Sequence, residues 1–210
     1  MSLRSLCMRW IALFALFSPS VLAALPDGVV AVSHPAAAAA GARMLAAGGN
    51  AVDAAAAVQF ALNVVEPQSS GIGGGGFMLI HLAKTGETFI VDSRERAPAA
   101  ASADMFAPDG LPMPFPLAST SGLAVGVPGT LRGVDTALTR WGTKTLADTL
   151  APAIELAEHG VRVNRFLAAD IANDGGRTRI HPETAAIFRP GGVPLAEGDW
   201  LVQPALARTL

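Results

Sequence analysis

Cysteine is nearly absent from this sequence. Its 210 residues include a single cysteine, Cys7, which lies in an N-terminal segment that we expect to be removed. The rest of the chain then has no thiol, and this excludes a disulfide framework, a cysteine nucleophile and a cysteine-based metal site. In an oxidising compartment, stability must therefore come from packing alone.

Charge is also scarce. Charged residues make up 15% of the chain, the formal net charge is -2, and no run of like charges occurs. A nucleic-acid-binding domain would carry a basic patch or a pI above about 9, so we expect no nucleic-acid partner. Hydrophobic residues reach 51%, but much of this fraction is alanine and does not by itself indicate a membrane protein. The length predicts one domain or a piece of one.

The N-terminus has the pattern of a secretory signal peptide, which we assign to residues 1–23. Two arginines precede an apolar stretch at 10–17, and small residues at 21–23 (Val-Leu-Ala) form the cleavage site. An uncleaved anchor is the alternative, but the apolar stretch is shorter than the ~20 residues that span a bilayer. We therefore expect residues 24–210 to be periplasmic or secreted, with no membrane association after signal cleavage.

The sequence predicts neither a metal site nor a cofactor. Its four histidines share no ligand spacing with one another or with acidic residues, and we expect each to be structural: His34, His81, His159 and His181. Ser69 and Ser70 precede glycines but lack the G-x-S-x-G pattern of a nucleophile elbow, so we expect them to be loop residues.

Strand and helix signals alternate in the first half of the chain. Residues 28–33 (GVVAVS) form a β-branched run typical of a buried strand, and His34-Pro35 begins an alanine-rich helix. The next helix is predicted over 51–65. Asn50 is its N-cap, and Asp53 at the third position favours the helix N-terminus electrostatically.

A β-hairpin follows, and most of the remaining chain reads as helical. Residues 77–82 are predicted to be a buried strand, and residues 88–91 pair back after a turn. The Pro- and Ala-rich section that ends at Ser121 exceeds usual connection lengths, so we expect it to wrap a surface or border a site. Five further helices are predicted to begin near Pro128, Leu146, Asn164, Pro182 and Val202.

The densest glycine segment is Ser70–Gly76 (SGIGGGG). Glycine is disfavoured in regular elements, so this density indicates positive φ angles or a backbone that lies close to another group. A phosphate-binding loop follows a strand and opens a helix, whereas this segment follows a helix and opens a strand. We therefore do not favour phosphate binding.

Arg94 ends the returning strand of the hairpin, beside this glycine segment. A guanidinium in such a position is suited to bind a carboxylate through two hydrogen bonds. A salt bridge to Asp92 or Glu95 is an equally good interpretation of the local sequence, because ion pairs are common near strand ends.

Three long segments, in this order and spacing, resemble one known family. They read AAGGNAVDAAAAVQFALNVVEP, SGIGGGGFMLIHL and VDSRERAPAAASADMF. The sequence is similar to the N-terminal part of the large subunit of γ-glutamyltranspeptidase, and the likeness continues to the GDWLVQPALARTL segment. It therefore covers nearly all of residues 24–210.

The resemblance implies an α/β (α+β) fold, the αββα sandwich of the N-terminal nucleophile hydrolases, incomplete in this chain. It implies a precursor that cleaves itself into a large and a small subunit. The new N-terminal threonine of the small subunit attacks the γ-glutamyl amide, with its own α-amino group as the general base. The donor is glutathione or another γ-glutamyl compound, the acceptor is an amino acid, a peptide or water, and no cofactor is involved.

The resemblance also implies a site residue. The family's arginine in a D-x-R-E segment binds the α-carboxylate of the donor, and here it falls on Arg94, with Glu95 expected to position it. The catalytic threonine belongs to the small subunit, so we expect no catalytic residue in this chain. Thr85, Thr143 and Thr145 lie in a turn or beside a helix start and do not replace it.

The last predicted helix lacks a stop signal before Leu210, which favours a truncated domain that is inactive alone. Two alternatives to γ-glutamyl chemistry stay open at this point. One is a cephalosporin acylase-like hydrolase with the same fold, and the other is a non-catalytic remnant that binds a small carboxylate.

Overall fold

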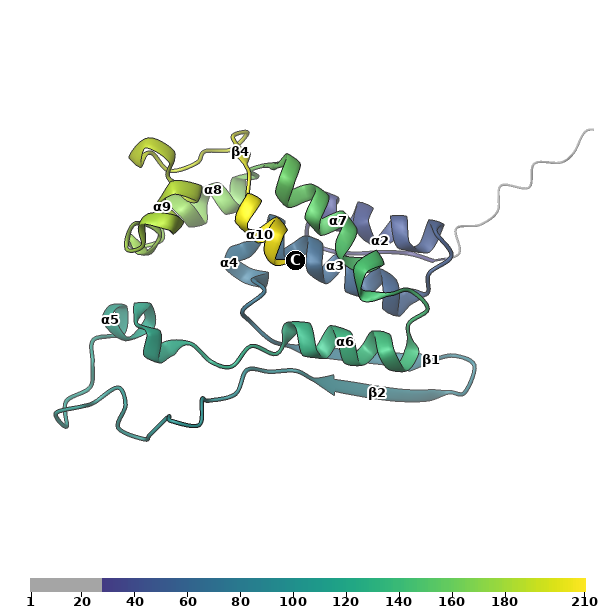
Figure 1. Cartoon of the computed structure of the whole chain (residues 1–210), viewed down its shortest axis with the longest axis horizontal. Helices are drawn as coiled ribbons and strands as arrows, with labels where there is room; N and C mark the ends of the chain where they lie inside the picture. The colour runs from purple at the N-terminus through teal and green to yellow at the C-terminus, as the bar shows by residue number, and fades with distance from the viewer. Residues whose placement is uncertain (1–27) are drawn as a thin grey trace, which may run out of the picture.

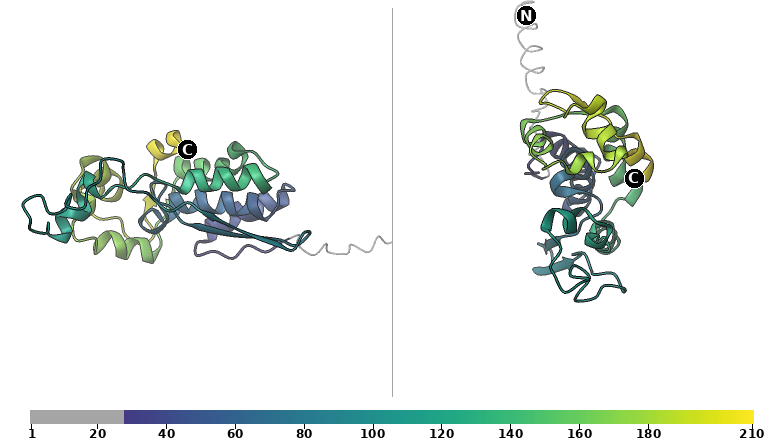
Figure 2. Two further views of the ribbon diagram at one scale, coloured as in Figure 1. Left: turned by 90° about the horizontal axis from the view of Figure 1, so that it is seen from below. Right: turned by 90° about the vertical axis from the view of Figure 1, so that its left-hand side faces the viewer.

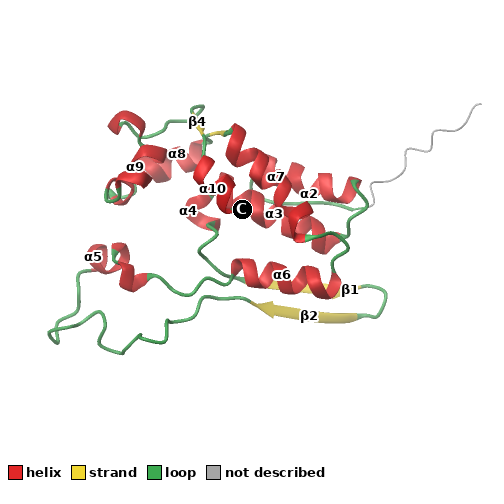
Figure 3. Cartoon of the chain, viewed as in Figure 1, coloured by secondary structure: helices red, strands yellow, loops and turns green. Residues whose placement is uncertain are grey.

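The computed structural model describes residues 28–210, and the predicted signal peptide at residues 1–23 lies outside them. Helices dominate, and the few strands form two small antiparallel pairs within the described residues (Figures 1 and 3). The elements of the first half are α2 (Pro35–Ala46), α3 (Ala51–Val65), α4 (Pro67–Ser70), β1 (Phe77–Leu82), β2 (Glu87–Asp92), α5 (Phe115–Thr120) and the short 3-10 helix η1 (Gly122–Ala124). Those of the second half are α6 (Thr130–Trp141), α7 (Leu146–His159), β3 (Val161–Arg162), α8 (Arg165–Ala172), η2 (Arg177–Arg179), α9 (Pro182–Phe188), η3 (Pro190–Gly192), β4 (Trp200–Leu201) and α10 (Pro204–Thr209).

Helix α3 is the centre of the structure, packed against α2 and α7 on one side and α6 on the other (Figure 1). It begins with a capping box, in which the Asn50 side chain accepts from the backbone of Asp53 and the Asp53 side chain accepts from the backbone of Asn50. The predicted bounds and cap of this helix are therefore confirmed. Alanines on α2 and α3 are fully buried where the two helices meet, because a methyl side chain allows close approach.

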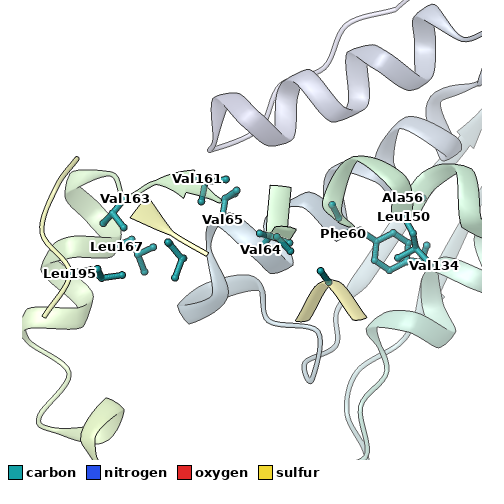
Figure 4. Close-up of a cluster of buried hydrophobic side chains, with 14 of the residues drawn as sticks. Ala56, Phe60, Val64, Val65, Val134, Leu150, Val161, Val163, Leu167 and Leu195 are labelled. Carbon is teal, nitrogen blue, oxygen red and sulfur yellow. The ribbon is translucent and has the colours of Figure 1, made fainter. Parts of the chain in front are cut away.

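The main hydrophobic cluster runs along α3 and continues into the second half of the chain (Figure 4). Phe60 and Val64 of α3 are fully buried, and they contact the same cluster as residues of α6, α7 and α8. Burying a side chain of this size contributes roughly 1.5–3 kcal/mol. The members labelled in the figure are Ala56, Phe60, Val64, Val65, Val134, Leu150, Val161, Val163, Leu167 and Leu195.

The hairpin of β1 and β2 is present, with Leu79 opposite Ile90, but the prediction of a buried strand is wrong. One face packs against α3 and α6 through Ile80, whereas Phe77, Leu79 and Ile90 on the other face are 69%, 71% and 70% exposed. No other described element covers this second face, so only alternate residues of the strand are shielded from solvent.

The strand predicted at 28–33 is also not formed. No strand of the described residues lies beside this segment to pair with it. Its side chains still alternate: Val29 is 89% exposed, while Val30 lies over Gly41 of α2 and Val32 packs on the α2–α3 cluster. The segment therefore lies extended along the helices. Its β-branched residues did not suffice to pair it with another strand.

The segment of residues 97–126, here named the arm, leaves the hairpin and returns to α6. Figures 1 and 2 show it projecting away from the helical body. It carries α5 and η1, neither of which was expected. Its two ends meet in an antiparallel bridge between Arg96 and Val127.

The second half confirms most of the predicted helices. Helix α7 runs from Leu146 to His159 and α9 from Pro182 to Phe188, both as expected, while α6 begins at Thr130 rather than at Pro128. Among residues 28–210 no helix is both long enough and apolar enough to cross a membrane.

Candidate functional site

Residues 71–76, here named the glycine loop, lie where the hairpin meets the N-terminus of α6. Residues 71–76 adopt no positive φ angle, so the first explanation for their glycines is wrong. The second, close approach, is confirmed at Gly75: a β-carbon there would lie 2.9 Å from the Glu95 nitrogen and 3.0 Å from the Arg94 Cα. Real β-carbons do not come closer than about 3.0 Å to such atoms.

Backbone hydrogen bonds connect this loop to both of its neighbours. Gly76 extends the ladder of the hairpin, because its carbonyl oxygen accepts from the Ser93 N–H at 2.9 Å and from the Ser93 hydroxyl at 3.1 Å. The Gly74 carbonyl accepts from the N–H groups of Gly129 and Thr130 at 2.9 and 3.0 Å. It thereby caps the first turn of α6, whose N-terminal N–H groups have no acceptor within their own helix.

Arg94 projects from this framework with its side chain 57% exposed. Its Nη2 lies 3.3 Å from Glu95 Oε2, and its Nη1 is 3.5 Å from the Gly75 carbonyl. Asp92 contacts the backbone N–H of Arg94 at 3.0 Å and not the guanidinium. Of the two predicted salt bridges, only the one with Glu95 is formed. It is exposed to solvent, and such pairs contribute little to stability.

Arg94 and Glu95 line a pocket of about 370 Å³ between α3, α4, the glycine loop and α6. Polar side chains from three helices share its wall, namely Gln59, Gln68, Ser69, Ser70 and Thr130. The prediction of loop positions for Ser69 and Ser70 is wrong, because they end the short helix α4. The glutamines and Thr130 were not identified from the sequence, since only the folded chain brings α3, α4 and α6 together.

Asn63 is a further residue that the sequence did not reveal. It is 1% exposed on α3, and its Nδ2 donates to the carbonyl of Ser70, which immediately precedes the glycine loop. Its Oδ1 has no hydrogen-bond partner among the described residues. The contact ties the loop to the central helix, and this fixes one wall of the pocket.

His34 and Thr145 cap helices in the described part of the chain. Residues 28–210 contain no group of three His, Cys, Asp or Glu side chains that could hold a metal ion. His34 Nδ1 accepts from the Ala36 N–H at 3.1 Å and caps α2. Burial lowers the pKa of His34, and the nearby carboxylate of Glu66 partly opposes this effect. Thr145 caps α7 together with Asp148.

The sequence model of the family described as Gamma-glutamyltranspeptidase matches residues 37–210. The chain belongs to this family. The glutathione hydrolase proenzyme of Bacillus subtilis (strain 168) is 51% identical over 186 residues, which cover 87% of this chain and 31% of that protein. The Acylase ACY 1 proenzyme of Pseudomonas sp. (strain SE83) is 43% identical over 189 residues, which cover 87% of this chain and 34% of that protein.

The crystal structure of Helicobacter pylori gamma-glutamyltranspeptidase has a TM-score of 0.82 to this chain at 40% identity, covering 87% of this chain and 52% of that one. The resemblance and the N-terminal nucleophile hydrolase fold are therefore confirmed, for a part of that fold. The chain spans about a third of the length of the curated relatives it matches.

Proposed function

We propose that the complete protein transfers the γ-glutamyl group of glutathione or a related γ-glutamyl compound to an amino acid or peptide acceptor, or hydrolyses it with water. The observation that carries this proposal is the position of Arg94, whose side chain is 57% exposed on the wall of a polar pocket. Membership of the gamma-glutamyltranspeptidase family supports it.

In this proposal Arg94 binds the α-carboxylate of the donor through charge-assisted hydrogen bonds, which contribute about 1.5–3 kcal/mol. Glu95 orients the guanidinium. The nucleophile is an N-terminal threonine outside the present sequence, which forms an acyl-enzyme with the γ-carbonyl carbon and releases the amine. Water or the acceptor amine then releases the glutamyl group and regenerates the hydroxyl. No cofactor takes part.

We further propose that the small subunit, cut from the same precursor, is a permanent partner of this part of the protein. The proenzyme names of the relatives support a cleaved precursor. The exposed apolar face of the hairpin supports an additional polypeptide layer, because a contiguous apolar patch on a strand pair is unfavourable in water. The signal-peptide pattern predicted at residues 1–23 supports export, to the periplasm or beyond.

The test is to express the complete precursor and measure turnover of a γ-glutamyl anilide and of a glutaryl anilide. We expect two bands on a denaturing gel and a strong preference for the γ-glutamyl substrate, which carries the α-amino acid group. Preference for the glutaryl substrate would support the second candidate, an acylase, which the 43% identity to an acylase proenzyme favours. Absence of turnover of either anilide by the processed protein would reject both.

A further inference from the structure

We propose that Gly75, Gly129 and Gly133 form a cage around the backbone of Ser93 and Arg94, and that this cage positions the guanidinium of Arg94 in the pocket. The inference rests on the proposed role of Arg94 in donor binding. Gly75 lies in the glycine loop, Gly129 is the N-cap of α6, and Gly133 lies within α6. We treat them as positioning residues because their proposed effect acts through Ser93 and Arg94.

Two of the glycines enclose the peptide bond itself. A β-carbon on Gly75 would overlap the Ser93 carbonyl oxygen and lie 3.0 Å from the Arg94 Cα. A β-carbon on Gly129 would overlap the same oxygen from the α6 side and lie 3.2 Å from the Arg94 carbonyl oxygen. The backbone at Arg94 therefore has no free space towards either element, and its place is set from both sides.

The third glycine encloses the side chain of Ser93. Gly133 is buried inside α6, where glycine is less favourable than alanine and therefore indicates a packing requirement. A β-carbon at this position would lie 2.5 Å from the Ser93 Cβ and would also overlap the Ser93 hydroxyl. Gly133 thus contacts a side chain, whereas Gly75 and Gly129 contact a carbonyl oxygen.

This difference makes the proposal testable. An alanine at position 133 should push the Ser93 segment away from α6 and carry Arg94 with it. Replacing Ser93 by glycine removes the two atoms that a new methyl group on residue 133 would overlap and leaves Val91 Cγ1 at 4.0 Å, an ordinary contact. Ser93→Gly should therefore rescue Gly133→Ala. It cannot rescue Gly129→Ala, which conflicts with a backbone atom that every residue possesses.

The experiment measures kcat and KM for a γ-glutamyl anilide with the complete, processed protein. We expect Gly133→Ala to raise KM about tenfold or more, since small misplacements of a binding group are costly, with a smaller change in kcat. In the Ser93→Gly background the same substitution should leave KM within about twofold, as independent sites do in a double-mutant cycle. Gly122→Ala, on the arm and with open space around its Cβ among the described residues, is the matched control.

Arg94→Ala separates the inference from the function on which it rests. If Arg94→Ala leaves KM unchanged, the proposed role of Arg94 is wrong. If Arg94→Ala raises KM but Gly133→Ala does not, the cage is wrong while the function stands. The cage also requires that Gly133→Ala add nothing to KM in the Arg94→Ala background. Should Gly133→Ala fail to fold, the Ser93→Gly double variant must still fold and bind donor like Ser93→Gly alone, and failure there would overturn the cage.

Discussion

The carboxylate of Asp53 accepts two hydrogen bonds from Thr143, ninety residues later, at 2.9 Å from the backbone N–H and at 2.6 Å from the hydroxyl. The N–H groups of Asn50 and Lys144 donate to the same carboxylate at 2.7 and 3.0 Å. Asp53 is fully buried, so this one anion joins the start of α3 to the connection between α6 and α7.

Replacing Asp53 by asparagine should destabilise the protein by about 3 kcal/mol, because the amide offers one acceptor oxygen and turns an NH2 group towards buried donors. Urea unfolding at pH 7 measures the change. The exposed Asp109→Asn is the control and should be neutral.

Burial raises the pKa of Asp53, but the hydrogen bonds from Thr143, Asn50 and Lys144 outweigh it and leave the pKa below 3.8. The contribution to stability is therefore present above pH 3.8 and is lost as the pH falls further. Equal changes in the free energy of unfolding for Asp53→Asn and Asp109→Asn would contradict the proposed role of the buried carboxylate.

Asp174 should give the protein a second acid-sensitive contact. Burial raises its pKa, but hydrogen bonds from Thr178 and Gly176 and the charge of Arg189, 3.2 Å away, lower it to about 2. Its stabilising effect is complete above pH 3.8 and is lost as the pH falls towards 2. The thermal midpoint of the wild type should therefore fall more steeply between pH 4 and 2.5 than that of Asp174→Asn. Parallel curves for the two proteins would show that the ion pair carries no such linkage.

Arg94→Ala should raise KM for a γ-glutamyl anilide by roughly 10- to 150-fold, the equivalent of about 1.5–3 kcal/mol. Arg94→Lys keeps the charge but loses the planar pair of donors, so it should recover only part of the affinity. The kinetics of the complete protein test both variants, with the nearby exposed Arg96→Lys as the control. An Arg94→Ala enzyme that binds donor like Arg96→Lys would refute the carboxylate contact.

Glu95→Gln should change KM by less than about fivefold, because its 3.3 Å pair with Arg94 is partly exposed and such pairs contribute about 0.2–1 kcal/mol. Its kcat should stay close to that of the wild type if Glu95 only orients the guanidinium. Steady-state kinetics over several pH values check this. A loss of kcat of a hundredfold would instead assign acid-base chemistry to Glu95.

Gly160→Ala should cost about 1–3 kcal/mol from its backbone angle alone, since φ is +83°. A β-carbon would also lie 2.8 Å from Val202 Cγ2, which should add to the loss. Gly198 also has a positive φ, +90°, with open space around it among the described residues, so Gly198→Ala measures the cost of a positive φ without a packing conflict. Chemical denaturation should place Gly160→Ala below Gly198→Ala, and the reverse order would contradict the packing contribution.

The predicted features that the structure confirms are mostly local. The cap at Asn50, the stop of α7 at Gly160 and the proline start of α9 each depend on residues within a few positions of one another. The strand at 28–33 was predicted wrongly because strand formation requires a partner, which local sequence does not supply. The role proposed for Arg94 came from the family resemblance, since its local sequence favoured an ion pair equally.

The parts of the site that could not be predicted depend on distant contacts. Gln59 and Thr130 become pocket residues only when α3 and α6 pack on each other. The glycine at 133 reads as a weak point of a helix until Ser93 is placed against it. A burial pattern within one element cannot show which residue of another element will fill the space.

The bridge between Arg96 and Val127 closes the arm two residues beyond Arg94. The arm is therefore a closed loop, whose interior can change in length or sequence while its two ends stay paired. Doubling the length of such a closed loop costs only about 0.6 kcal/mol in chain entropy. A change within the arm can therefore leave its paired ends, and the nearby arginine on the pocket wall, in place.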